Sequence, residues 1–173
     1  MTQTQERDET RTRTFSWADP MPVAARLGRL PGLDMLRAMS RGELPAPPIM
    51  ATMGIERFEA DDGEVRLWMP VREFHYNPLG TVHGGVIATL LDTGTGCAVH
   101  SVLPAGVGYT SLDLHTRFLR PATIDSGELR CTGTVLSRTR RSAVAEARLE
   151  DGGGRLLAHA TSSCLIFDLP SGG

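Results

Sequence analysis

The stretch that decides the fold runs from residue 77 to residue 101 and reads Asn77-Pro-Leu-Gly-Thr-Val-His-Gly-Gly-Val-Ile-Ala-Thr-Leu-Leu-Asp-Thr-Gly-Thr-Gly-Cys-Ala-Val-His-Ser101. A polar loop leads through His-Gly-Gly into a segment that is apolar almost all round, which predicts a buried helix. One acid, Asp92, stands inside this segment. Because burying an unpaired carboxylate is costly, Asp92 is a candidate for chemistry.

The start of the predicted helix is a second candidate feature. Free backbone N–H groups near Gly84 and Gly85 form a site that favours developing negative charge. The helix rises roughly 12 Å from Gly84 to Asp92, so one reacting group cannot easily touch both on the same copy. Two copies packed antiparallel across a two-fold axis would bring them face to face, which predicts an active site at a dimer interface. Gly94 and Gly96 favour the close approach of another backbone, and we expect helix packing there.

Length and composition predict one soluble, unexported domain without a nucleic-acid partner. The 173 residues suffice for one core, and 22% charged residues with a net charge of -2 give no electrostatic argument for nucleic acid. Cys97, Cys131 and Cys164 lie far apart, so neither a disulfide framework nor a zinc site is indicated and a reducing cytoplasm fits best. The N-terminus lacks the apolar core of a signal peptide, and no segment approaches the roughly 18 apolar residues of a membrane span.

The N-terminal quarter of the chain divides into a tail and a helical extension. Residues 1–16 are polar and predict a disordered tail. Residues 17–48 predict two short helices and a Pro-rich linker that act as a lid or brace. Asp19-Pro20 can start the first helix, and Gly42 ends the second. The apolar positions of the two helices are Val23, Leu27 and Leu30, then Leu33, Leu36 and Met39.

Residues 49–168 predict an α+β domain in which a mainly antiparallel sheet is covered by the long helix on its dry face. After that helix, Leu112, Leu114 and Phe118 are expected to point to one face of a strand. The methionines, Met35 and Met39 included, read as core filler, although flexible side chains also suit an acyl pocket. The predicted strands are Ile49 to Ala60, Glu64 to Val71, Tyr109 to Arg120, Glu128 to Thr139, Ser142 to Glu150 and Arg155 to Phe167.

Three motifs in a fixed order carry a resemblance to a known family. They are Asn77-x-x-Gly80-x-x-His83-Gly84-Gly85, then Leu91-Asp92, and later Phe118-Leu119-Arg120-Pro121-Ala122. With one helix and an antiparallel sheet around it, the chain resembles the hot-dog fold acyl-CoA thioesterases of the PaaI type over roughly Ile49 to Phe167. The resemblance implies a hot-dog fold with an N-terminal helical extension, an acyl-CoA substrate, and a homodimer or homotetramer. It implies no metal and no cofactor beyond the coenzyme A of the substrate.

The resemblance also implies roles for the residues already singled out. The amide of Gly84 would polarise the thioester carbonyl, with Gly85 beside it in the substrate site. Asp92 would act as general base toward water or as nucleophile, and both mechanisms stay open. At Gly96, one turn later, some related enzymes carry a hydroxyl residue that aids catalysis, and this chain lacks it.

Four further residues are matched to the site by the same resemblance. Asn77 matches a residue that positions thioester or water, and a plain turn role before Pro78 is its alternative. His83 matches a residue that shapes the site, and a helix-capping role is nearly as good a reading. Ser111, with Thr110 as second choice, matches a hydroxyl that orients water from the partner chain.

Arg138, Arg140 and Arg141 form a basic cluster at a predicted strand turn. The plain reading is a solvated hairpin end, and the functional one is a site for the phosphates of coenzyme A, since planar guanidinium groups suit phosphate oxygens. The cluster is too small for nucleic acid. His100 and Cys97 would form a metal pair only if further ligands converged on them.

Two alternative functions remain beside acyl-CoA hydrolysis. A hot-dog hydratase or dehydratase would carry a His-Phe-Pro signature, which this sequence lacks. A non-catalytic module that binds acyl-CoA or another ligand would keep the same pocket while dispensing with Asp92, and turnover separates it from an enzyme.

Overall fold

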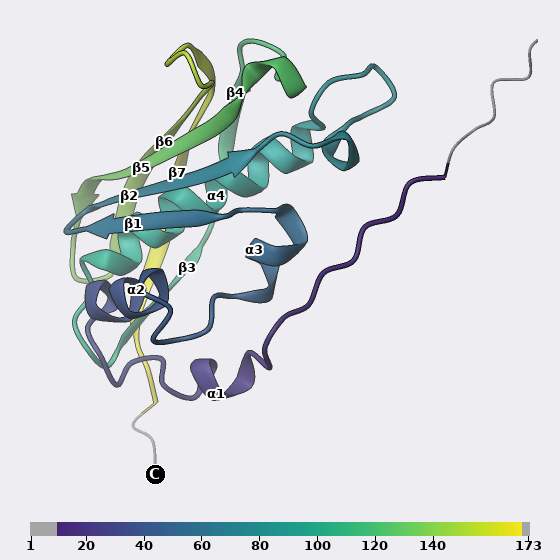
Figure 1. Ribbon diagram of the computed structural model, residues 1–173. Helices are drawn as coiled ribbons and strands as arrows, with labels where there is room; N and C mark the ends of the chain where they lie inside the picture. Colours follow the sequence, from purple (N-terminus) through teal and green to yellow (C-terminus); the bar gives the residue numbers. More distant parts are fainter. Residues whose placement is uncertain (1–9, 171–173) are drawn as a thin grey trace, which may run out of the picture.

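The computed structural model describes residues 10–170. Short helices form its N-terminal part, and a sheet that surrounds one long helix forms the rest (Figure 1). Short 3₁₀ turns cover Glu73–His75 and Ile124–Ser126. The helices and strands are α1 Met21–Ala24, α2 Gly32–Ser40, α3 Pro48–Met53, β1 Arg57–Asp61, β2 Glu64–Pro70, α4 Gly84–Ser101, β3 Val107–Ser111, β4 His115–Phe118, β5 Glu128–Arg138, β6 Ser142–Glu150 and β7 Leu156–Asp168.

The strands form one antiparallel sheet in the order β1-β2-β5-β6-β7-β3, and β4 pairs with β7 beside β3. Helix α4 lies along one face of this sheet and packs on β2, β5, β6 and β7 (Figure 1). The predicted α+β arrangement, an antiparallel sheet around one long central helix, is therefore confirmed.

The core lies between α4 and the inner face of the sheet. Alternate residues of β2, Val65, Leu67 and Met69, are fully buried and meet Leu90 and Leu91 of the helix. Burying a side chain of this size stabilises a fold by about 1.5 to 3 kcal/mol. This packing fixes the rotation of α4 about its axis, and so decides which of its residues stay uncovered.

Two glycines of α4 allow the helix to pack closely on the sheet, Gly94 against β5 and Gly96 against Tyr109 of β3. A methyl group on Gly133 of β5 would overlap the backbone of Gly94, and one on Gly94 would lie 2.9 Å from Cys131 Sγ. A methyl group on Gly96 would lie 2.8 Å from the hydroxyl of Tyr109. The expected close approach of another backbone is therefore confirmed at Gly94, but that backbone belongs to β5, so the expectation of a second helix there is wrong.

The predicted strand from Ile49 to Ala60 is wrong in its first half. Residues 48–53 form α3, which begins with Pro48 at a position that tolerates a missing N–H. It ends at Gly54, whose φ of 76° is the left-handed conformation that closes helices. Strand β1 starts after this glycine, at Arg57.

The predicted strand from Tyr109 to Arg120 is split into β3 and β4. At the break, the carboxylate of Asp113 accepts a hydrogen bond from the backbone N–H of Ser163 at 2.9 Å, which replaces a ladder bond. Leu112 and Phe118 are 64% and 57% exposed, so the expectation that they face the dry side is wrong for both.

The first predicted helix is short and the second is as predicted. Helix α1 covers Met21–Ala24, and turns follow it over residues 25–29, where the φ of 82° at Gly28 does not fit a right-handed helix. Helix α2 starts at Gly32, whose N–H donates to the carbonyl of Leu103 at 2.9 Å. A methyl group on Gly32 would overlap the carbonyl of His100, so the two backbones are in contact at the end of α4.

Helix α2 also bonds to the outer side of β1. The hydroxyl of Ser40 donates to the carbonyl of Phe58 at 2.7 Å, and Arg37 Nε donates to that of Ala60 at 3.1 Å. The predicted tail, residues 1–16, lies partly outside the described residues; within residues 10–16, Arg13 donates to the carbonyl of Thr52 at 2.7 Å.

Candidate active site

His83 is the N-cap of α4, and its side chain accepts a hydrogen bond from the second of the two glycines that follow. With φ of -61° and ψ of 137° it stands just outside the helix, and its Nδ1 accepts the N–H of Gly85 at 2.9 Å. Among residues 10–170 nothing accepts the N–H of Gly84. The capping alternative for His83 is thus what the structure contains, and Gly84 retains an unpaired donor at the positive end of the helix.

The side chain of Asn77 is engaged within its own loop. Its Oδ1 accepts the N–H of Leu79 at 2.8 Å, and its Nδ2 donates to the hydroxyl of Thr81 at 3.0 Å. Gly80 takes a φ of 75° inside the same turn. This is the turn role left open by the sequence, and a role toward substrate stays a prediction.

His75, which the sequence analysis did not single out, holds the segment before α4 in place. It is 3% exposed, its Nδ1 accepts the N–H of Arg72 at 3.0 Å, and its Nε2 lies 2.8 Å from the carbonyl of Met53. Its own carbonyl accepts the N–H of His83 at 2.8 Å. With Nδ1 accepting, Nε2 carries the proton, so the ring is neutral; burial lowers its pKa, as this environment requires.

The low pKa of His75 makes stability depend on pH. Unfolded His75 binds a proton near its ordinary pKa of about 6.5, while folded His75 does not, so stability is full above that pH and falls as pH drops toward the folded pKa. We expect wild type to lose up to about 1.4 kcal/mol per pH unit in this window through this residue. Urea unfolding at pH 7.5 and 5.5 should show a shallower loss for His75→Gln than for wild type. Equal slopes for the two proteins would contradict this assignment.

Asp92 lies on the face of α4 that the sheet does not cover. Its side chain is exposed, so the expectation of a buried acid is wrong for a single copy of the chain. The hydroxyl of Ser111 donates to Asp92 Oδ1 at 3.5 Å, a long hydrogen bond. Thr110, one residue earlier on β3, points to the opposite side, so the structure brings Ser111 and not Thr110 to the acid.

Two other reactive side chains near Asp92 are held neutral. Burial, together with the charge of Asp92, raises the pKa of the Cys97 thiol to about 12. Burial likewise raises the pKa of Tyr109 well above its usual value. A thiol that stays protonated is a poor nucleophile, so Asp92 is the group in this neighbourhood that can serve as base or nucleophile. The hydroxyl of Tyr109 occupies the space that a side chain at Gly96 would need.

The free amide and the acid stand apart on one helix. From Gly84 to Asp92, α4 rises roughly 12 Å. A hollow of about 310 Å³ opens beside Gly84, and residues 118–121 line its far side. Within one copy, therefore, a carbonyl held by Gly84 is out of reach of Asp92.

The basic cluster does not meet the acid within one chain. Arg138, Arg140 and Arg141 are exposed at the turn between β5 and β6. Strand pairing puts Arg138 in one row with Ser111, across Ala143 and Cys164. Three strand spacings separate them, or about 14 Å.

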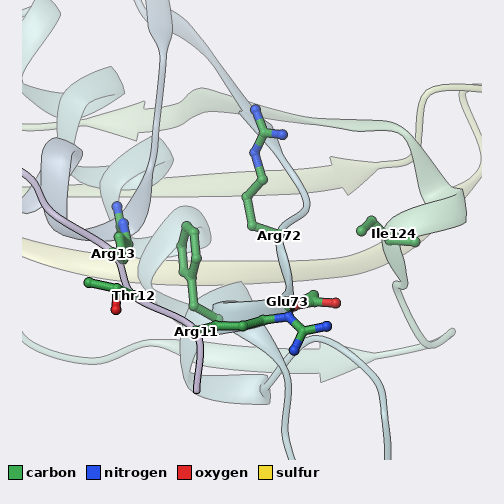
Figure 2. A pocket seen from close by; sticks show the side chains of 7 residues that line it. Arg11, Thr12, Arg13, Arg72, Glu73 and Ile124 are labelled. Carbon is green, nitrogen blue, oxygen red and sulfur yellow. Dashed lines mark ion pairs between the residues drawn. The ribbon is translucent and has the colours of Figure 1, made fainter. Parts of the chain in front are cut away.

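A second hollow, of about 510 Å³, lies beside the segment that leads to the Asn77 loop (Figure 2). Its arginines are already engaged: Arg11 pairs with Glu73 at 2.7 Å, and the Arg13 guanidinium stacks over the ring of Phe74 at 3.8 Å. Across residues 10–170, no three His, Cys, Asp or Glu side chains gather in a way that would hold a metal ion. In the same part of the chain, no helix has the length and apolar character needed to cross a membrane.

Comparison with known proteins adds family information to this geometry. Residues 79–158 match the thioesterase superfamily. A protein of Halobacterium salinarum named as an esterase is 42% identical over 82 residues, and mouse acyl-coenzyme A thioesterase 13 is 34% identical over 91 residues. These alignments cover 44% and 52% of this chain, and the chain spans 54% and 64% of the length of the two relatives.

A solved structure gives a fuller match. A protein of Ralstonia eutropha, described as a thioesterase related to phenylacetic acid degradation, is 31% identical and superposes with a TM-score of 0.68. The match covers 75% of this chain and 98% of that one. The solved protein is therefore matched almost over its whole length, and about a quarter of this chain lies outside the match.

Proposed function

Since the chain belongs to the thioesterase superfamily and has its hot-dog fold, we propose that it hydrolyses an acyl-coenzyme A thioester to a free acid and coenzyme A. The observation that carries this proposal is the pair formed by the unpaired N–H of Gly84 and the exposed carboxylate of Asp92. The first can hold a developing oxyanion, and the second can activate water or attack directly.

The reaction would need stabilisation of the negative charge on the thioester oxygen and attack on the carbonyl carbon, for which Asp92 offers two routes. The thioester oxygen accepts a hydrogen bond from Gly84, and as the carbonyl carbon is attacked its negative charge grows toward this donor. In the general-base route, Asp92 takes a proton from the attacking water, which Ser111 helps to orient, and the thiolate of coenzyme A leaves. In the nucleophilic route, Asp92 attacks the carbonyl carbon and the thiolate of coenzyme A leaves, which gives an anhydride; water then hydrolyses this anhydride to the free acid and restores Asp92. Both routes remain open.

A second copy of the chain would complete the site. The face of α4 that carries Asp92 and the adjacent edge of β3 and β4 are uncovered, and the apolar side chains of Leu112, Phe118 and Leu119 are exposed there. Such a surface suits an interface between copies. We infer a homodimer or a dimer of dimers in which Gly84 of one chain works with Asp92 of the other.

Mixed dimers test this shared site. Gly84→Pro removes the free N–H at a first helical position that follows extended His83 and tolerates proline, and its Cβ would lie 3.4 Å from the ring of Phe118. A purified dimer of one Gly84→Pro and one Asp92→Asn chain should regain about half of the wild-type activity, because one of its two sites is intact. A dimer of one Asp92→Asn chain and one chain that carries both substitutions should show no activity, because neither site retains Asp92. No recovery in the first dimer would place both residues in one chain and overturn the shared site.

The function itself is tested by thiol release from a panel of aryl-CoA and fatty acyl-CoA esters. Turnover of at least one ester by the wild type supports the proposal. Binding of acyl-CoA with no turnover of any ester would instead support the ligand-binding module.

We further propose that Arg138, Arg140 and Arg141 contact the phosphates of coenzyme A. We also propose that the protein, with its three free thiols, works in the cytoplasm.

A further inference from the structure

We propose that Arg13 is a positioning residue for the active site, because it joins the N-terminal segment, residues 10–16, to the turn that holds the start of α4. Through this turn it fixes the position of Gly84, whose free N–H is the proposed oxyanion donor. The inference rests on the proposed function, because it assigns a further residue to the same site.

The guanidinium of Arg13 closes the C-terminal end of α3. Its Nη1 donates to the carbonyl of Thr52 at 2.7 Å, and its Nη2 donates to the carbonyl of Ala51. Both carbonyls belong to the last turn of the helix, where acceptors are left over and a positive charge is favoured. Two hydrogen bonds therefore hold the Arg13 side chain in one place.

The same side chain contacts the turn Glu73–His75. The Arg13 guanidinium lies over the ring of Phe74, 3.8 Å from its centroid, and this ring meets the His75 ring edge to face with centroids 4.4 Å apart. The Nε2 of His75 in turn lies 2.8 Å from the carbonyl of Met53, the last residue of α3. Because an arginine both stacks on an aromatic face and donates hydrogen bonds, Arg13 fastens this turn to the end of α3.

Backbone hydrogen bonds connect the turn to the start of α4. The carbonyl of His75 accepts the N–H of His83 at 2.8 Å, and the next residue, Tyr76, forms an antiparallel bridge with Val82. His83 directly precedes Gly84, and its side chain accepts the N–H of Gly85. A displacement of the turn therefore moves the peptide between His83 and Gly84, which carries the free N–H.

The other contacts of the N-terminal segment are weaker. Arg11 pairs with Glu73 at 2.7 Å, but both side chains are more than half exposed, and ion pairs so exposed contribute little to stability (Figure 2). The rings of Phe15 and Trp17 contact each other, and both stay largely in solvent. The link between the segment and the active site is therefore placed at Arg13.

Replacement of Arg13 by Ala is expected to lower kcat about tenfold and to change KM less than about twofold. Removing an oxyanion donor outright costs about a hundred- to a thousandfold in kcat, and a donor that is only displaced loses part of this. The loss falls on kcat because the hydrogen bond from Gly84 strengthens as negative charge develops on the thioester oxygen. The measurement is thiol release by the full-length protein on the best ester of the panel.

Three variants separate positioning from a general loss of stability. Arg13→Lys keeps the charge but loses the paired N–H groups and the stacking, so its kcat should lie between those of wild type and Arg13→Ala. Arg26→Ala, at an exposed arginine of the same extension, should keep the wild-type kcat. Ser40→Ala removes a hydrogen bond between the extension and β1, so it should lower the melting temperature while leaving kcat unchanged. A loss of kcat in Ser40→Ala equal to that in Arg13→Ala would overturn the inference.

A double-mutant cycle shows whether Arg13 acts through the free N–H. In a protein that already carries Gly84→Pro this donor is absent, so adding Arg13→Ala should lower the residual kcat less than about twofold. A further loss of about tenfold in the double variant would overturn the positioning role and leave the thioesterase proposal intact.

Backbone amide NMR spectra give a readout that does not depend on turnover. Arg13→Ala should shift the N–H resonances of His83 and Gly84, while that of Gly153, on the turn between β6 and β7, stays in place. Unchanged resonances of His83 and Gly84 would overturn the inference. Shifted resonances in a protein whose wild type hydrolyses no ester would instead overturn the thioesterase proposal itself.

Discussion

Replacement of Asp92 by Asn is expected to lower kcat/KM for acyl-CoA hydrolysis about a hundredfold or more. Asparagine keeps the size of the side chain but neither takes a proton from water nor attacks the carbonyl. Because the carboxylate is exposed and has one long hydrogen bond to Ser111, its loss should leave the free energy of unfolding nearly unchanged.

The measurement is thiol release on the best ester of the panel, with thermal unfolding of the same samples. Asp62→Asn, an exposed Asp on the hairpin turn between β1 and β2, is the matched control and should keep wild-type activity. A loss of less than about tenfold in Asp92→Asn would remove the acid from the chemistry. Equal losses in both variants would point to a general effect of charge.

Replacement of Gly133 by Ala is expected to cost about 3 kcal/mol of unfolding free energy, at the upper end for overpacking. The added methyl group would overlap the backbone of Gly94, and neither a strand nor a helix backbone can step aside as a flexible side chain does. Helix α4 must then move away from β5, which loosens the packing of the core between the helix and the sheet.

Urea unfolding measures this loss, with Gly153→Ala as control. A methyl group on Gly153 would come no nearer than 3.4 Å to any neighbour, so that variant should stay within about 0.5 kcal/mol of wild type. A loss below about 1 kcal/mol in Gly133→Ala would mean that α4 and β5 are not in contact. Activity should fall together with stability, since α4 carries both halves of the proposed site.

The central helix was readable from the sequence because its signals are local. The His-Gly-Gly start and the long apolar run predicted a helix, and the structure places it at Gly84–Ser101. The pairing of Ser111 with Asp92 was also within reach, since β3 must follow a short turn back along the helix.

The exposure of Asp92 was not readable, because it depends on which face of α4 the sheet covers. An apolar count around the helix suggests burial on every side, yet the sheet covers one side and leaves the other open. The role of His75 was hidden for a similar reason: its contact with Arg72 is local, but its second partner, the carbonyl of Met53 at the end of α3, meets it only in the folded chain. Helix α3 was misread as strand although Pro48 and Gly54 mark both of its ends.

The bonds from α2 to β1 have a consequence for any attempt to reduce the protein to its minimal domain. Strand β1 is the last in the sheet, and its outward carbonyls at Phe58 and Ala60 are occupied by Ser40 and Arg37. A shortened protein beginning at Ile49 would present these carbonyls unprotected, next to the apolar surface that Leu36 now covers. Bare strands of this kind recruit strands from other molecules, so such a truncation would favour aggregation edge to edge. The extension therefore protects the edge of the sheet from pairing with other molecules.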